Sequence, residues 1–229
     1  MNKNDSVEKI GFLGRSYEEY IQMFNLTKEY LKDQKTLDIA SGASSFTPQL
    51  LNKGFNITAA DVLYNTEPQE LEKISSNDFN TLIQAHSGLD CNSDWNFFKN
   101  SDDMIKQRTM VYKEFIGSYN KEKGKIYIPA ELPSLPFKNN EFSLVLCSHL
   151  LFLYDDRLDY DFHLQSLKEM LRVTSREIRI YPLGRSNCKS KFLGQIIKYL
   201  SKYAHVDLLK VNYVSKHGGN EMMRIIKKI

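Results

Sequence analysis

The sequence predicts an α/β fold with a mostly parallel sheet, because short apolar segments typical of strands alternate along the chain with segments of helical spacing. Two consecutive strands are expected near the C-terminal end, joined by the turn His217-Gly218-Gly219-Asn220, and they would form an antiparallel hairpin. The chain has 229 residues, which suits one domain over 1–229.

The individual elements follow from the spacing of apolar residues and from the residues that end each segment. Strands are expected over 36–40, 55–60, 125–128, 142–147, 177–181, 206–213 and 221–226. Helices are expected over 46–53, where Gly54 ends the segment, and over 160–173 and 189–203. This alternation predicts helices on both faces of the sheet.

Two regions lie outside the alternating pattern. Residues 16–33 carry aromatic and apolar side chains at helical spacing, as one helix or two broken near Asn25, so 1–33 is expected to form a helical cap. Residues 64–123 are polar with scattered aromatic residues, and a structureless loop of that length is implausible in a compact domain. We therefore expect a helical insertion over 64–123 after the second strand, with 101–119 as its clearest helix.

Composition narrows the class of protein. Apolar residues make up 41% and charged residues 26% of the chain, as in ordinary globular proteins. The net charge of +3 does not require a nucleic-acid partner. The segment from Arg185 onward is rich in lysine and arginine, which is typical of a solvated surface, with a patch for an anionic partner as the alternative.

The sequence also bears on location and on metal binding. No apolar run reaches the roughly 18–20 residues that cross a bilayer, and the first residues lack the apolar stretch of a signal peptide. We therefore expect a cytoplasmic protein without a membrane partner. Cys91, Cys147 and Cys188 form no CxxC pair and no Cys/His cluster, so no metal site is expected.

The strongest local signal is TLDIASGASSF, residues 36–46, where a strand is followed by a turn of small residues and a helix. In such a unit a ligand lies at the carboxyl end of the strand, and small residues let the backbone approach it. Asp38 lies within the strand, where a buried carboxylate needs donors from an ammonium group or an ordered turn. Asp61 ends the next strand, where a carboxylate can bind two ribose hydroxyls or cap the following segment.

A third segment, IPAELPSLPFKNNEFSLVLCSHLLFLY over 128–154, carries a turn, a buried strand, and then Ser148 and His149 at the same sheet edge. With SLKEMLRVTSREIRIYPL after them, these segments resemble class I S-adenosylmethionine-dependent methyltransferases, particularly the small-molecule type. The resemblance covers 30–63 and 125–182, and it implies a Rossmann-like sheet and S-adenosylmethionine as cofactor. The first motif departs from the family pattern because Gly42 is its one glycine.

The resemblance assigns roles to residues of this chain. The methionine portion of the cofactor would lie at Asp38 and at the turn, the ribose at Asp61, the adenine at Val62, and the sulfonium near Ser148. From the N-terminal cap, Arg15 would pair with the cofactor carboxylate and the rings of Tyr17 and Tyr20 would face the sulfonium, unless these rings serve helix packing alone. The full set of expected cofactor-binding residues is Asp38, Ala40, Ser41, Gly42, Ala43, Asp61, Val62, Ala130, Glu131, Ser148, Arg15 and Tyr20.

Methyl transfer needs alignment of the reactants, and it needs a base only when the acceptor must lose a proton. His149 is the candidate base, with a role in orienting backbone or cofactor as the alternative, and His163 and His86 are weaker candidates. The insertion is expected to form the pocket for a small-molecule acceptor, unless its aromatic residues form a core of their own. Those residues are Trp95, Phe97, Phe98, Tyr112 and Phe115, and further possible acceptor contacts are Tyr154, Tyr160, Tyr181 and Arg185.

Other functions remain open. A nucleic-acid (RNA) methyltransferase shares the fold, but Cys147-Ser148-His149-Leu150 replaces the Asn/Asp-Pro-Pro-Tyr motif of many base-modifying enzymes. A nicotinamide-dependent oxidoreductase is disfavoured because the turn lacks GxGxxG. A non-catalytic binding module with the same fold, and a transferase that moves another group of the same cofactor, are the remaining alternatives.

Overall fold

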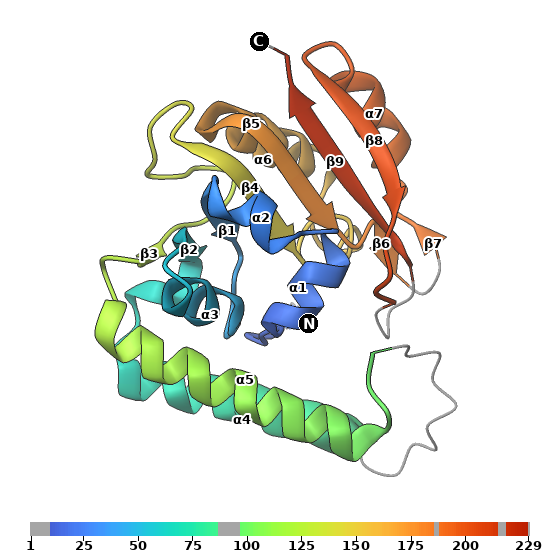
Figure 1. Ribbon diagram of the computed structural model, residues 1–229. Helices are drawn as coiled ribbons and strands as arrows, with labels where there is room; N and C mark the ends of the chain where they lie inside the picture. The colour runs from blue at the N-terminus through green and yellow to red at the C-terminus, as the bar shows by residue number, and fades with distance from the viewer. Residues whose placement is uncertain (1–9, 87–96, 186–187, 215–218, 229) are drawn as a thin grey trace, which may run out of the picture.

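One mixed sheet forms the centre of the molecule in a computed structural model that describes residues 10–86, 97–185, 188–214 and 219–228 (Figure 1). Its order across the described strands is β3-β2-β1-β4-β5-β9-β8; β9 pairs antiparallel with β5 and β8, and the other pairs are parallel. The predicted seven-stranded, mostly parallel sheet with an antiparallel C-terminal hairpin is confirmed. The strands are β1 (Lys35–Ile39), β2 (Asn56–Asp61), β3 (Tyr127–Pro129), β4 (Phe142–Ser148), β5 (Thr174–Tyr181), β8 (Ala204–Lys210) and β9 (Glu221–Lys227).

Helices cover both faces of this sheet, as predicted (Figure 1). One face carries α1 (Tyr17–Met23), α2 (Lys28–Lys32) and α3 (Phe46–Asn52), and the other carries α6 (Tyr160–Val173) and α7 (Leu193–Leu200). Successive residues of a strand point to opposite faces, so Leu146 of β4 packs with α1 and α3 while its neighbour Val145 packs with α6 and α7. Both side chains are fully buried, so the sheet has an apolar core on each side.

The connection from β2 to β3 is the predicted helical insertion. It contains the short helix η1 (Val62–Asn65) and the long helices α4 (Pro68–His86) and α5 (Ser101–Glu122), which lie side by side (Figure 1). Phe115 and Tyr119 of α5 pack with Tyr64 and with Tyr127 of β3 in a buried aromatic cluster. This cluster fixes the insertion to the β2–β3 side of the sheet.

The N-terminal region forms two short helices, which is one of the two predicted arrangements. The break lies at Asn25, whose φ of 45° ends α1 before Thr27 caps α2. Ser16 begins α1 with a capping box, in which its Oγ accepts a hydrogen bond from the Glu19 N–H and its own N–H donates to the Glu19 carboxylate. Residues 10–16 have no regular secondary structure, and we call them the strap.

The structure differs from the sequence expectations near the C-terminal end. Strand β8 ends at Lys210, before the predicted 213, because Val211 and Tyr213 turn into the core that holds α1. Helix α7 is shorter than 189–203, because β6 (Gly184–Arg185) and β7 (Cys188–Lys189) form a small hairpin that the sequence pattern did not indicate. Residues 217 and 218 of the predicted turn lie outside the described residues.

Within the described part of the chain, no helix combines the length and the apolar character needed to cross a bilayer.

Candidate functional site

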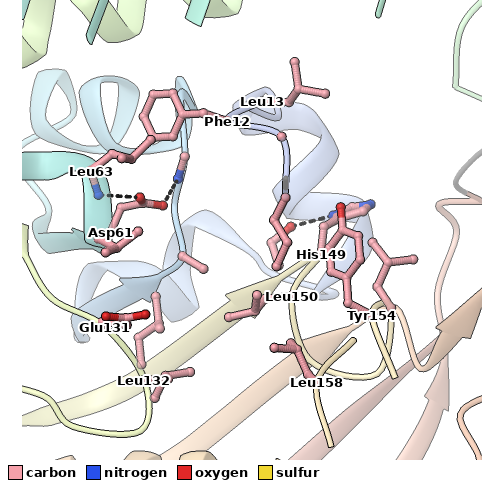
Figure 2. A pocket seen from close by; sticks show the side chains of 18 of the residues that line it. Phe12, Leu13, Asp61, Leu63, Glu131, Leu132, His149, Leu150, Tyr154 and Leu158 are labelled. Carbon is pink, nitrogen blue, oxygen red and sulfur yellow. Dashed lines mark hydrogen bonds between the residues drawn. The ribbon is translucent and has the colours of Figure 1, made fainter. Parts of the chain in front are cut away.

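A cavity of about 300 Å³ lies at the carboxyl ends of β1, β2, β3 and β4 (Figure 2). This volume is at the small end of the range for ligand pockets. The order of the strands changes direction between β1 and β4, which is where open α/β sheets bind ligands. Among its lining residues are several with a predicted role, namely Arg15, Ala40, Gly42, Asp61, Val62, Ala130, Glu131, Ser148 and His149.

The turn after β1 follows a glycine-type path although it keeps a single glycine. Ala40 has φ of 53° and Gly42 has φ of 58°. Positive φ costs an alanine roughly 1–3 kcal/mol, and residues in such conformations cluster at functional sites. At Gly42 a side chain has no room, since an ideal Cβ would lie 2.4 Å from the carbonyl oxygen of Leu13. The turn therefore needs glycine at 42 and tolerates strain at 40.

Asp61 joins the turn to the end of β2. Its Oδ2 accepts a hydrogen bond of 3.1 Å from the Gly42 N–H, and its Oδ1 accepts one of 3.0 Å from the Leu63 N–H, so it also caps η1 (Figure 2). The residue is 9% exposed, and burial raises the pKa of its carboxyl above the ordinary value. Each carboxylate oxygen has a second lone pair, so the side chain can still accept bonds from a ligand in the cavity.

Asp38 lies beneath the turn and does not contribute to the described lining of the cavity. Its Oδ2 accepts a hydrogen bond of 2.7 Å from the Ser41 hydroxyl, and the Tyr20 hydroxyl lies 3.0 and 3.2 Å from its two oxygens. An ammonium group or an ordered turn was expected to supply donors to Asp38. In the structure the turn supplies one through Ser41, and Tyr20 of α1 supplies another. Burial raises the pKa of Asp38 to about 7, although these hydrogen bonds lower it, and Asp61 nearby adds to the rise.

The second and third strand ends form one wall of the cavity. Val62 is 50% exposed there, which is unusual for a valine and leaves apolar surface available to a ligand. The Ala130 N–H donates to the Asp61 carbonyl oxygen over 3.1 Å, which extends the contact between β2 and β3 past their last paired residues. Glu131 follows it and is exposed at the edge of the cavity (Figure 2).

His149 lies across the cavity from Asp61 (Figure 2). Its N–H donates to the Tyr181 carbonyl oxygen over 2.7 Å, so the end of β5 holds its backbone. Its Nδ1 shares a hydrogen bond of 2.8 Å with the Ser148 hydroxyl, and its φ is 54°. A positive φ at a non-glycine residue is a strain that the surrounding contacts must hold in place.

The strap closes the cavity from the side of the N-terminal cap. Ser44 Oγ and Ser45 N–H both donate to the Arg15 carbonyl oxygen, over 2.8 and 3.1 Å, so the strap lies on the turn. Arg15 lines the cavity, and its buried Nε has no hydrogen-bond partner among the described residues. The carboxylate of Glu19 lies 3.8 Å from this Nε, too far for a hydrogen bond.

Several residues with a predicted role lie away from the cavity. Tyr20 packs beneath the turn, Ser41 and Ala43 are buried within the turn, and the ring of Tyr17 stacks on that of Phe46 at 5.9 Å. His163 is structural: its Nδ1 pairs with the Asp159 carbonyl oxygen, and its Nε2 accepts from the Phe152 N–H. The side chain of His86 lies outside the described residues.

The aromatic residues of the insertion that the structure describes do not line this cavity. Phe115 belongs to the buried aromatic cluster, Phe97 packs on Tyr213 at 5.4 Å, and Phe98 lies under the guanidinium of Arg108. The Tyr112 hydroxyl donates to the Glu72 carbonyl oxygen within the insertion. Trp95 lies outside the described residues.

Sequence reasoning missed an apolar part of the lining. It consists of apolar residues from the loop after β4, from the first turn of α6 and from the strap, namely Leu150, Leu153, Leu158, Phe162, Ile10, Phe12 and Leu13; Figure 2 labels Phe12, Leu13, Leu150 and Leu158 among them. The signal for this part of the lining was the apolar run over 150–154 directly after His149, in which Tyr154 was the predicted acceptor contact.

The strand order and the antiparallel place of β9 define the fold as that of Rossmann-like class I methyltransferases. Similar solved structures include magnesium protoporphyrin IX methyltransferase (ChlM) from Synechocystis PCC 6803 with bound SAM, at 10% identity over 88% of this chain and 73% of that one, with a TM-score of 0.47. The PH0226 protein from Pyrococcus horikoshii OT3 is 16% identical over 92% of this chain and 89% of that one, with a TM-score of 0.49.

The chain belongs to the same protein family as a protein of Methanocaldococcus jannaschii named "Uncharacterized protein MJ0045". The two are 40% identical over 227 residues, which is 98% of each chain. No family model matches the sequence.

Replacing Gly14 by alanine should destabilise the protein, whereas replacing Gly11 should not. An ideal Cβ on Gly14 would lie 1.9 Å from the Ala43 carbonyl oxygen, but the nearest atoms to a Cβ on Gly11 are 3.8 Å away. Overpacking costs about 1–3 kcal/mol, so Gly14→Ala should lower the free energy of unfolding in urea by that amount and Gly11→Ala by less than about 0.5 kcal/mol. Equal stability of the two variants would contradict the packing of the strap on the turn.

The Asp38 carboxyl should make stability depend on pH. Its pKa is raised from 3.8 to about 7 in the folded protein, so the folded state binds this proton more tightly than the unfolded state does. Stability from this group is therefore complete below about pH 4 and is lost as the pH rises through 7, by about 4 kcal/mol. Asp38→Asn lacks this titration, so wild type should lose stability relative to the variant between pH 4.5 and 7.5 in urea unfolding. Parallel pH profiles of the two proteins would refute the assignment.

Proposed function

We propose that the chain is an S-adenosylmethionine-dependent methyltransferase that acts on a small-molecule acceptor by in-line displacement. The observation that carries the proposal is the cavity at four adjacent strand ends, with the buried Asp61 on its wall and the Gly42 turn beside it. In an open parallel sheet this position is the usual one for a nucleoside-containing ligand. The sequence resemblance to class I methyltransferases supports the same conclusion from the residues of three motifs.

The residues of the cavity fit the chemistry of an adenosyl cofactor. The Asp61 carboxylate has acceptor capacity for ribose hydroxyls beyond its two backbone bonds. Val62 offers exposed apolar surface that an adenine ring would cover, beside Ala130 and Glu131. The Nε of Arg15 is a buried donor without a hydrogen-bond partner among the described residues, 3.8 Å from the Glu19 carboxylate, and it suits a carboxylate of the cofactor.

In this proposal, some of the predicted cofactor-binding residues support the binding turn and do not contact the cofactor. Asp38 binds Ser41 and Tyr20, so its carboxylate holds the turn against the N-terminal cap. Tyr20 stacks on Phe46 at 4.3 Å, which leaves its ring part of the packing between α1 and α3. We therefore assign Asp38, Tyr20, Ser41 and Ala43 to the support of the binding turn, and direct contact to Ala40, Gly42 and Arg15.

When bound, S-adenosylmethionine supplies a methyl group on a positively charged sulfonium, which a nucleophile can displace in line. The chain's own residues orient the reactants and exclude water, a task that suits Leu150, Leu153 and Phe162 of the apolar lining. His149 is the proposed base for an acceptor that must lose a proton, and the Ser148 hydroxyl orients its ring.

Calorimetry with S-adenosylmethionine and S-adenosylhomocysteine tests the proposal. Wild type should bind both, and Asp61→Asn should bind at least about tenfold more weakly, because hydrogen bonds to a charged carboxylate contribute about 1.5–3 kcal/mol. Asp33→Asn is the matched control, because this exposed carboxylate ends α2 just before the amino end of β1 and should leave binding unchanged. Absence of binding by wild type would remove the basis of the proposal.

The acceptor class can then be approached by incubating the protein with labelled methyl donor and a metabolite extract. The mass of any product separates methyl transfer from transfer of a larger group of the same cofactor, because a methyl adds the smallest increment.

A further inference from the structure

The strap is a wall of the cavity whose position depends on contacts at its two ends. It contributes Ile10 to Leu13 and Arg15 to the lining, and Gly14 lies against the turn with no room for a side chain. Within the strap the backbone makes one local hydrogen bond, from the Leu13 N–H to the Gly11 carbonyl oxygen at 3.1 Å. Because the strap has no regular secondary structure, its position depends on its contacts with neighbouring elements, which include the bonds from Ser44 and Ser45 to the Arg15 carbonyl oxygen.

The first end of the strap is held by both helices of the insertion. The Phe12 N–H donates to the Asp78 Oδ2 of α4 over 2.7 Å. The Phe12 ring lies in the buried aromatic cluster, 5.7 Å from the Phe115 ring of α5 and 6.3 Å from the ring of Tyr64. Asp78 is distant in sequence and lies outside the cavity lining, so its contact with the cavity is indirect.

The second end of the strap is held by a buried ion pair with the insertion. Ser16 donates to Glu19, whose carboxylate forms a paired contact with the guanidinium of Arg108 on α5, and the Tyr213 hydroxyl donates to Glu19 Oε1 over 2.6 Å. Burial raises the pKa of Glu19, but the Arg108 charge outweighs it and holds the pKa below the ordinary value. Removing one partner of a buried pair is strongly destabilising, so this end is the firmly fixed one.

We propose that the helical insertion positions the strap over the bound ligand, with Asp78 as a positioning residue at the end that opens and Arg108 at the end that stays fixed. At the Asp78 end a partly buried hydrogen bond of 2.7 Å holds the strap backbone beside the buried Phe12 ring, whereas the Arg108 end is a buried network that includes an ion pair. Loss of the Asp78 contact therefore raises the population of the open strap and speeds ligand release. The inference rests on the proposed function for the choice of ligand, S-adenosylhomocysteine.

The test compares Asp78→Ala with Asp78→Asn, which keeps an oxygen acceptor for the Phe12 N–H. Surface plasmon resonance should give about fivefold faster release of S-adenosylhomocysteine from Asp78→Ala, the effect of one hydrogen bond, and release near the wild-type rate from Asp78→Asn. Amide hydrogen exchange without ligand should be faster at 11–14 in Asp78→Ala alone. Glu114→Ala is the control, because it removes the 2.9 Å bond from Gln49 that joins α3 to α5 and leaves the strap contacts intact.

The outcomes separate this inference from the proposed function. If wild type binds no S-adenosylhomocysteine, the proposed function fails, and the exchange rates at 11–14 still decide the positioning of the strap. Unchanged exchange and unchanged release in Asp78→Ala, or equal changes in Glu114→Ala, would overturn the inference. If Asp78→Ala does not fold, Phe12→Leu loosens the same end through the aromatic cluster and should change exchange and release in the same direction.

Discussion

The site depends on one carboxylate that joins two strand ends. Asp61 ends β2 and accepts hydrogen bonds from the backbone of the turn after β1 and from the first turn of η1. These bonds hold the glycine turn open toward the cavity and fix where the insertion begins. Because the residue is almost fully buried, leaving these two N–H groups without it would cost about 1–3 kcal/mol each. The same side chain thus shapes the cavity and offers acceptors to its contents.

The turn shows how a motif with few glycines keeps the shape that a ligand needs. Ala40 takes a positive φ, and the hydrogen bonds of Asp38 with Ser41 and Tyr20 hold the backbone on either side of it. The buried carboxyl of Asp38 carries a cost of its own, which its raised pKa reflects. The ring of Tyr20 in α1 stacks on the ring of Phe46 in α3 at 4.3 Å, and this packing stabilises the strained and buried turn. Helix α1 therefore supports the turn through Tyr20.

The fold was largely predictable from the sequence because its signals are local. The mostly parallel sheet with helices on both faces follows from alternating strands and helices, and helix α6 has the predicted bounds because Asp159 caps it and its apolar spacing is regular. Residues at strand ends, such as Asp61 and Ser148, were also predictable, because carboxyl ends of parallel strands meet at one edge. The burial of Asp38 against Tyr20 was not, because it depends on how α1 packs across the sheet.

The role of the insertion could not be predicted from sequence patterns either, because it depends on contacts between segments that are distant in the sequence. Aromatic residues line ligand pockets and also fill protein cores, so the composition of the insertion fits either; Phe115 packs in a core. Helices α4 and α5 are connected to the strap by a backbone N–H of Phe12 and a carboxylate of Glu19, which meet partners 66 and 89 residues away. Neither a backbone donor nor a single acid carries a periodic signal. Helices α4 and α5 can influence the site without lining it, since a wall with no secondary structure is only as well placed as the contacts that hold it.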